Sequence, residues 1–291
     1  MGMLLNLFLT LKLIAMNAVF DWKRWMLYLG KHWNENKKRY LLSLAAIGGL
    51  LILWYSFLMI VDPDNPMGQR MQIVTFYVGL FLTGCLFAST MFNDLSNGPK
   101  AIHYLLTPAS AMEKLLTAIV FGVVLFFISY TAVFYVIDFI MLKISNGVVS
   151  TYLERMHHAP KPPQQLLNVF ESDVRGDEFL FYILLIFFAV QSIFLLGSVY
   201  FVKNQYIKTL ISGLVVFLFM VFFIHKLLGS FMPDGGFYQP FTVYRIYNSD
   251  QGDVMIQLPE WLSSILLFIT KYTLAPALWV VAYVRLKEKE V

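Results

Sequence analysis

Six long apolar runs constrain this chain more than any other feature of its sequence. Tyr40–Val61 and Met71–Phe92, for example, contain no charged residue at all. A helix that crosses the hydrocarbon core of a bilayer needs about 20 consecutive, mostly apolar residues. Only 14% of the 291 residues are charged, against about 25% in a typical soluble domain. The sequence therefore predicts an all-α, polytopic membrane protein.

The apolar runs define six predicted spans and two regions. We place the spans at about 40–61, 71–92, 115–137, 179–202, 209–226 and 261–284, so that 40–291 forms a six-helix transmembrane domain. The uncharged run of the fifth span, Thr209–Ile224, has only 16 residues, but the flanking Lys208 and Lys226 can snorkel to the interfaces and lengthen it. Residues 1–39 form an N-terminal cytoplasmic or interfacial segment.

The N-terminal segment has the composition of a helix that lies in the membrane interface. Between Met16 and Trp33, tryptophans alternate with charged residues such as Lys23 and Arg24. The preceding stretch, Met1–Ala15, is apolar but too short to span and lacks the positively charged start of a secretory signal. It is either part of the interfacial segment or an extension upstream of a start at Met16.

The distribution of Lys and Arg predicts the orientation of the chain. Of the 22 such residues, fourteen lie in segments on the side of the termini, seven lie on the other side, and Lys271 falls inside the sixth span. Positive residues concentrate on the cytoplasmic side of membrane proteins. Both termini are therefore assigned to the cytoplasm, and the segments 141–178 and 227–260 are assigned to the opposite side.

The sequence offers no catalytic, cofactor-binding or metal-binding site that spacing can define. It contains no phosphate-loop motif and no H-E-x-x-H or G-x-S-x-G motif. His157 and His158 are adjacent, so on a helix they point about 100° apart and cannot bind one metal as an i, i+4 pair does. The net charge is +4, but the Lys and Arg residues lie beside the apolar runs and do not form a basic stripe with interleaved aromatic residues. We therefore expect no nucleic-acid partner.

Two ionisable residues lie inside or beside predicted spans. Asp138 is near the outer end of the third span, and Lys271 is ten residues into the sixth. A lysine at the centre of a membrane helix costs about 2.5–3.5 kcal/mol on insertion scales. Lys271 either snorkels to an interface or faces a functional cavity. An ion-coupled carrier that uses Lys271 and Asp138 is thus one hypothesis for the chain.

The polar segment 93–114 is the most informative cytoplasmic piece. Residues Ala101–Leu106 can form a short amphipathic helix, which the Thr107-Pro108 step ends because a residue before proline disfavours the helical conformation. Ser110 followed by Glu113 is a capping box, which predicts the start of the next helix. Such a short exposed helix could dock a soluble partner, or the segment could be a plain connecting loop.

A family resemblance rests on this segment. The stretch Leu105-Leu106-Thr107-Pro108-Ala109-Ser110-x-x-Glu113-Lys114 resembles the L-L-P-x-S-R-x-E-x-x-x-x-K loop of type-2 ATP-binding-cassette (ABC) exporter permeases, particularly the short six-span permeases of the Bacteroidetes. The amphipathic helix before the first span and the charged ending Arg285–Glu290 are also similar to that family.

The resemblance implies the permease subunit of an ABC exporter in the bacterial inner membrane. A separate ATPase subunit, which would hold ATP and Mg, is then expected to dock on the loop, and a second permease chain, identical or different, completes the transporter with membrane lipid around it. The implied docking residues are Ile102, Tyr104, Leu105, Leu106, Pro108, Ser110 and Glu113. The alternative is a non-transporting membrane scaffold or sensor that uses the segments 141–178 and 227–260.

Overall fold

Six helices are long and apolar enough to cross a membrane, which confirms the predicted multi-pass, helical architecture. The computed structural model describes residues 20–96, 98–159, 161–170, 177–231, 235–239, 243–246, 254–257 and 259–289. The N-terminal stretch Met1–Ala15 and the alternative start at Met16 lie outside the described residues.

The first span belongs to a much longer helix than predicted. Helix α2 runs from Trp22 to Val61 over 40 residues, a length of about 60 Å. The expected boundary between the interfacial segment and the span, at residues 39 and 40, is absent. The intervening sequence Asn34–Arg39 contains no glycine or proline that would break a helix. After the turn at residues 62–68, helix α3 covers Gln69–Ser89.

The middle of the chain forms the predicted short helix and then a second very long one. A 3₁₀ turn, Asn93–Ser96, leads into α4, Gly98–Leu106, which ends where the Thr107-Pro108 step predicted. Helix α5 (Ala111–Ile119), a π-helical turn (Val120–Leu125) and α6 (Phe126–Arg155) follow without a break. The third span is therefore longer than 115–137, and residues 141–155 of the predicted outer segment are helical.

The C-terminal half consists of three further spans and a small sheet. Helices α7 (Asp177–Tyr200) and α8 (Gln205–Phe231) are the fourth and fifth spans. The sixth comprises α9 (Glu260–Phe268), a π-helical turn (Ile269–Thr273) and α10 (Leu274–Lys289). Between α8 and α9, strands β1 (Gly235–Gln239), β2 (Val243–Ile246) and β3 (Val254–Gln257) form an antiparallel sheet in the order β1-β2-β3, which the sequence analysis did not predict.

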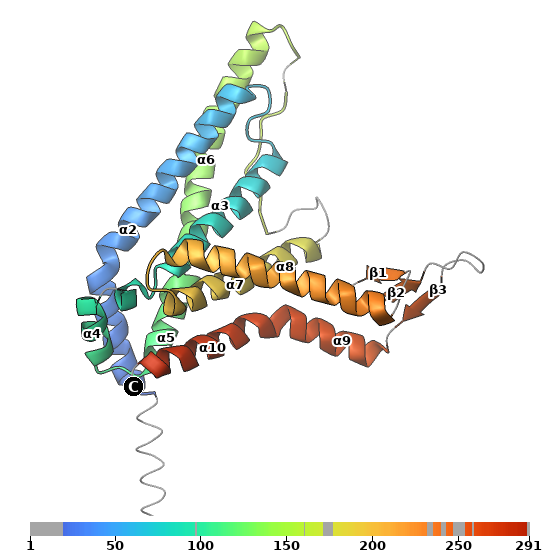
Figure 1. The fold of residues 1–291 in the computed structure, drawn as a ribbon. Coiled ribbons are helices and arrows are strands. Elements are labelled where there is room, and N and C mark those ends of the chain that lie inside the picture. Colours follow the sequence, from blue (N-terminus) through green and yellow to red (C-terminus); the bar gives the residue numbers. More distant parts are fainter. Residues whose placement is uncertain are drawn as a thin grey trace, which may run out of the picture.

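The helices form two arms that diverge from one end of the molecule (Figure 1). One arm contains α2, α3 and α6, and the other contains α7, α8, α9 and α10. The start of α2, helices α4 and α5, and the end of α10 lie together where the arms meet. In the first arm, the rings of Phe76 and Phe134 pack edge to face at 5.0 Å, and the Tyr130 hydroxyl donates to the Phe76 carbonyl over 2.9 Å. This aromatic core joins α3 to α6.

Candidate functional site

Helix α4 presents apolar side chains outward at the end where the arms meet. Ile102 is 62% exposed and Leu106 is 77% exposed, and Pro108 is exposed beside them. Tyr104, Leu105 and Ser110 are half-buried, and Glu113 is completely buried. The seven predicted docking residues thus divide into an exposed apolar group, which a partner could contact, and an inner group that supports it. We call α4, the turn 107–110 and the first turn of α5 the platform.

Ser110 and Glu113 begin α5, as the sequence predicted. The Glu113 backbone N–H donates to Ser110 Oγ over 3.3 Å, and the Ser110 backbone N–H donates to Glu113 Oε2 over 2.9 Å. Both halves of the capping box are therefore present. The capping box satisfies backbone donors that the first turn of a helix would otherwise leave without a partner.

Glu113 also joins the platform to α2, a role that the sequence analysis missed. Arg24 Nε donates to both carboxylate oxygens, over 2.9 and 2.8 Å, and Arg24 Nη2 lies 2.7 Å from Oε1. The backbone N–H of Asp21 donates to the same Oε1 over 2.8 Å. Glu113 therefore lies under the platform as its anchor, and it is buried away from any docking partner.

Asp21 caps the other helix of this junction. Its carboxylate accepts hydrogen bonds from the backbone N–H groups of Lys23, over 2.8 Å, and Arg24, over 3.1 Å. The hydrogen bond from the Arg24 backbone is the main cause that lowers the Asp21 pKa from its ordinary value of 3.8, since it favours the ionised form. The first turns of α2 and α5 thus share one hydrogen-bonded carboxylate network.

Further contacts between α2 and the platform hold it in place. Trp25 Nε1 donates to Thr117 Oγ1 over 3.1 Å, and Lys31 Nζ donates to Thr107 Oγ1 over 3.3 Å. Both contacts cross from α2 to the platform or to the helix that leaves it. Together with the Glu113 network, they fix the platform along more than two turns of α2.

The buried side chain of Lys114 joins α5 to α4. Its side chain is buried, and Nζ donates to the Leu105 carbonyl over 3.4 Å while lying 5.3 Å from the centre of the Tyr104 ring. The lysine therefore satisfies a carbonyl in the last turn of α4, where helical carbonyls lack intrahelical partners. An ammonium over an aromatic ring adds a favourable electrostatic contact.

Other segments assigned to the side of the termini reach the same end. Gln205 Nε2, in the first residue of α8 after the α7–α8 link, donates to Ser96 Oγ over 2.7 Å. Near the C-terminus, the Arg285 guanidinium lies 5.0 Å from the centre of the Tyr200 ring. The structure thus brings the start of α2, the segment 93–114, the α7–α8 link and the end of α10 together. That this end faces the cytoplasm remains the prediction of the positive-residue count.

The two intramembrane ionisable residues lie in different environments. Asp138 is completely buried on α6, and the Tyr55 hydroxyl of α2 donates to its Oδ1 over 2.6 Å. Its Oδ2 has no hydrogen-bond partner among the described residues. Lys271, in the π-helical turn before α10, donates to the Tyr182 hydroxyl of α7 over 2.7 Å. Asp138 and Lys271 therefore contact different helices in different arms.

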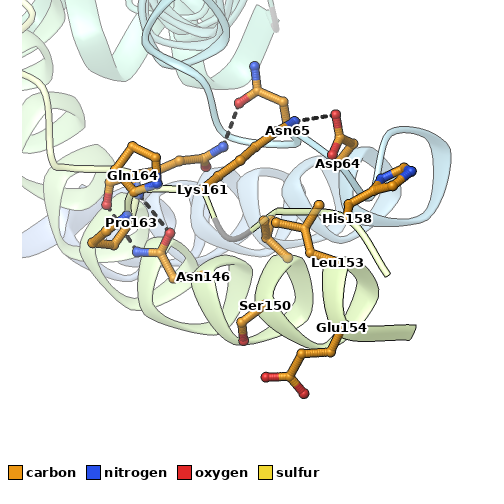
Figure 2. Close-up of a pocket in the computed structure, with 12 residues that line it drawn as sticks. Asp64, Asn65, Asn146, Ser150, Leu153, Glu154, His158, Lys161, Pro163 and Gln164 are labelled. Atoms are coloured by element: carbon orange, nitrogen blue, oxygen red, sulfur yellow. Dashed lines mark hydrogen bonds and ion pairs between the residues drawn. The ribbon is translucent and has the colours of Figure 1, made fainter. Parts of the chain in front are cut away.

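A polar pocket lies at the far end of the first arm (Figure 2). It has a volume of about 850 Å³. It is lined by Asp64 and Asn65 from the α2–α3 turn, by Asn146, Val149, Ser150, Leu153 and Glu154 from α6, and by His158 and Lys161–Gln164 from the segment that follows. Lys161 pairs with Asp64 in the wall of the pocket. Among the described residues, no three His, Cys, Asp or Glu side chains gather as a metal site would require.

The extended segment 161–170 closes one side of this pocket by packing back onto the arm. The Gln164 backbone N–H donates to Asn146 Oδ1 over 2.9 Å, and Asn146 Nδ2 returns a 3.0 Å hydrogen bond to the Gln164 carbonyl. The buried Gln72 of α3 accepts from the Leu167 N–H over 3.0 Å. Because Lys161 pairs with Asp64, the segment also contacts the α2–α3 turn.

Comparisons of the chain with models of known families, with characterised proteins and with solved structures give no match. The fold and the site define the class of protein: a polytopic helical membrane protein with six candidate spans and an anchored platform at one end.

Proposed function

We propose that the chain is the permease subunit of an ABC-type exporter, energised by a separate ATPase subunit that docks on the platform. One observation carries the proposal: α4 presents exposed Ile102 and Leu106 from a base that is fixed to both long helices. A docking helix that transmits force needs both properties, an apolar contact surface and a rigid support. Because the chain has no phosphate loop, ATP and Mg would be bound by the partner.

The contacts of the platform define a route by which a partner would move the membrane domain. A displacement of α4 reaches α5 through Lys114, whose Nζ holds the Leu105 carbonyl. It reaches α2 through the ion pair of Glu113 with Arg24. Both receiving helices continue without a break into the first arm, α2 to Val61 and the α5–α6 helix to Arg155. A movement of the platform would therefore shift the position of the far end of that arm.

The proposal includes a second permease chain, identical or different, and a cytoplasmic location for both termini. The almost complete exposure of the apolar fifth span supports a further contact, with lipid or with that second chain. A helix that is hydrophobic on all sides must be buried, either in a protein core or in a membrane. In a membrane, acyl chains or a helix of a partner chain surround it. The direction of transport, export, comes from the resemblance alone.

Copurification tests the proposal. The tagged protein should retain a Walker-type ATPase after extraction from native membranes in a mild detergent. The double variant Ile102→Asp, Leu106→Asp should lose that partner while staying in the membrane, because both side chains are exposed and their replacement opens no cavity. Met156→Asp is the matched control, since Met156 is also an exposed apolar residue but lies beyond the end of α6. An ATPase retained by the double variant would overturn the docking site.

A second candidate function, a membrane scaffold or sensor, is favoured by the polar pocket. Its wall carries both signs of charge, with the paired Lys161 and Asp64 and, in addition, Glu154, which suits a small zwitterionic or polar ligand. In this case the spans only anchor the pocket. Repeated purification without any ATPase, together with binding of a polar ligand that Lys161→Ala weakens, would favour the sensor over the permease.

A further inference from the structure

An open groove of about 310 Å³ separates α2 from α3 in the first arm. Its α2 wall includes Arg39, Ser43, Ala46 and Leu50, which recur at helical spacing and therefore share one face. Its other wall includes Leu86 of α3 and Thr90, the residue that follows α3. Apart from Arg39 at one end, these walls are apolar or carry only small hydroxyl groups.

Two hydrogen bonds join α2 to α3 and the residue after it, one at each end of the groove. Arg39 Nη2 donates to the Thr90 carbonyl over 3.2 Å at one end. Trp54 Nε1 donates to Thr75 Oγ1 over 3.1 Å further along the same pair of helices. Between these bridges, Ala46 is exposed and too small to fill the gap. The helices are thus tied together at both ends and open in the middle.

The length and charge of the groove match one leaflet of a bilayer. Arg39 and Leu50 are eleven positions apart on α2, a rise of about 16 Å, and half of a typical hydrocarbon core is about 15 Å. The basic end of the groove lies where the uncharged run begins, at Tyr40, and the adjacent Lys37 and Lys38 are exposed as well. The headgroup of a lipid would therefore contact the basic end of the groove, and its acyl chain would contact the apolar walls.

We propose that this groove binds one anionic phospholipid, with an acyl chain between α2 and α3 and its phosphate at Lys37–Arg39. Arginine binds phosphate through a planar fork of five N–H donors, and the contact to the Thr90 carbonyl uses one arm of that fork. A soluble peptide would not enter a groove that opens inside the apolar run.

Native mass spectrometry of the delipidated full-length protein tests the site. Palmitoyl-oleoyl phosphatidylglycerol is titrated against phosphatidylcholine with the same acyl chains. We expect one site with at least fivefold tighter binding of phosphatidylglycerol, since one basic residue near an anionic headgroup contributes about fivefold, or about 1 kcal/mol. Equal binding of the two lipids would overturn the proposal.

Two variants separate the acyl chain from the headgroup. Ala46→Phe fills the groove and should abolish the tight site, whereas Ala45→Phe, which adds the same ring at the neighbouring exposed position outside the groove, should leave it intact. Arg39→Gln should keep lipid binding but reduce the preference for phosphatidylglycerol about fivefold. Unchanged binding by Ala46→Phe would overturn the site. If that variant does not fold, Thr83→Phe fills the groove from the α3 wall and decides in its place.

Discussion

The Arg24 guanidinium and the Glu113 carboxylate form a bidentate ion pair that joins the first turn of α2 to the first turn of α5. Arg24 Nε contacts both carboxylate oxygens, and Nη2 approaches Oε1 to 2.7 Å. The Glu113 side chain is completely buried, whereas 35% of the Arg24 side chain is exposed. Because Glu113 also caps α5, one carboxylate determines where α5 begins and which helix supports the platform.

Replacing Glu113 by Gln should destabilise the protein. The variant removes the charge that pairs with Arg24 and presents an amide N–H₂ to the guanidinium. Breaking a buried ion pair by removing one partner costs about 3–5 kcal/mol, and we expect about 2–3 kcal/mol here because Arg24 keeps access to water. The free energy of unfolding in mixed detergent micelles measures the loss.

A double-mutant cycle provides the control for this prediction. Arg24→Gln and Glu113→Gln together should cost less than the sum of the single changes, because contacting residues are energetically coupled. Additive costs would mean that the pair, despite its geometry, contributes no coupling of its own. The double variant should also show whether the platform keeps its partner when the anchor carries no charge.

Asp21 should make the stability of the junction depend on pH at the acidic end. Its pKa is lowered in the folded protein, mainly by the hydrogen bond from the Arg24 backbone N–H. A lowered folded-state pKa gives stability that is present above the unfolded pKa and is lost as the pH falls through the folded pKa. The loss should therefore occur below the ordinary aspartate pKa of 3.8.

The Asp21→Asn variant is the matched control, since it can still cap α2 but does not titrate. The difference in unfolding free energy between the wild type and Asp21→Asn should shrink as the pH is lowered from 5 to 3. A difference that stays constant over this range would show that the charge of Asp21 does not stabilise the folded protein.

The six spans were predictable because a charged side chain is costly in hydrocarbon, so each span appears in the sequence as an apolar run with few or no charged residues. The uncharged run that ends at Val61 ends with α2 itself, before Asp62 and Pro63. The starts of helices were less predictable. Residues Asn34–Arg39 are polar, which suggests an interface, yet polar residues without glycine or proline continue a helix as readily as they end one.

The site was predictable only where its signals were local. The capping box of Ser110 and Glu113 and the end of α4 at Leu106 follow from neighbouring residues, and the structure confirms both. The contact of Glu113 with Arg24 joins positions 89 residues apart, so no helical periodicity could indicate it. The sequence could not distinguish an exposed docking glutamate from a buried anchor.

The Tyr55→Phe variant should destabilise the packing of α2 against α6. Tyr55 donates the hydrogen bond that Asp138 Oδ1 accepts, and both side chains are completely buried. Without the hydroxyl, the carboxyl group would lose this donor in a site where water cannot replace it. A buried polar group left without a partner costs about 1–3 kcal/mol. The Tyr272→Phe variant, at an exposed tyrosine of the second arm, is the control and should change the unfolding free energy little.

Gly197 should be intolerant of any side chain, because α7 and α8 approach each other there. A Cβ at Gly197 would lie 2.7 Å from the Cβ of Thr209, closer than real Cβ atoms come. Thr209 is buried, and its hydroxyl donates to the Gln205 carbonyl over 2.7 Å, so its side chain cannot turn away without losing that bond. Overpacking of this kind typically costs about 1–3 kcal/mol, which we expect for Gly197→Ala.

Gly147→Ala is the matched control, since Gly147 also lies within a helix but nothing lies within 4 Å of its added Cβ. Alanine is favoured over glycine in a helix by up to about 1 kcal/mol, so this variant should be neutral or more stable. Opposite signs for the two glycine variants in thermal unfolding would establish that α7 and α8 are in contact at Gly197. A Gly197→Ala variant as stable as Gly147→Ala would instead mean that the two helices stand further apart in the membrane.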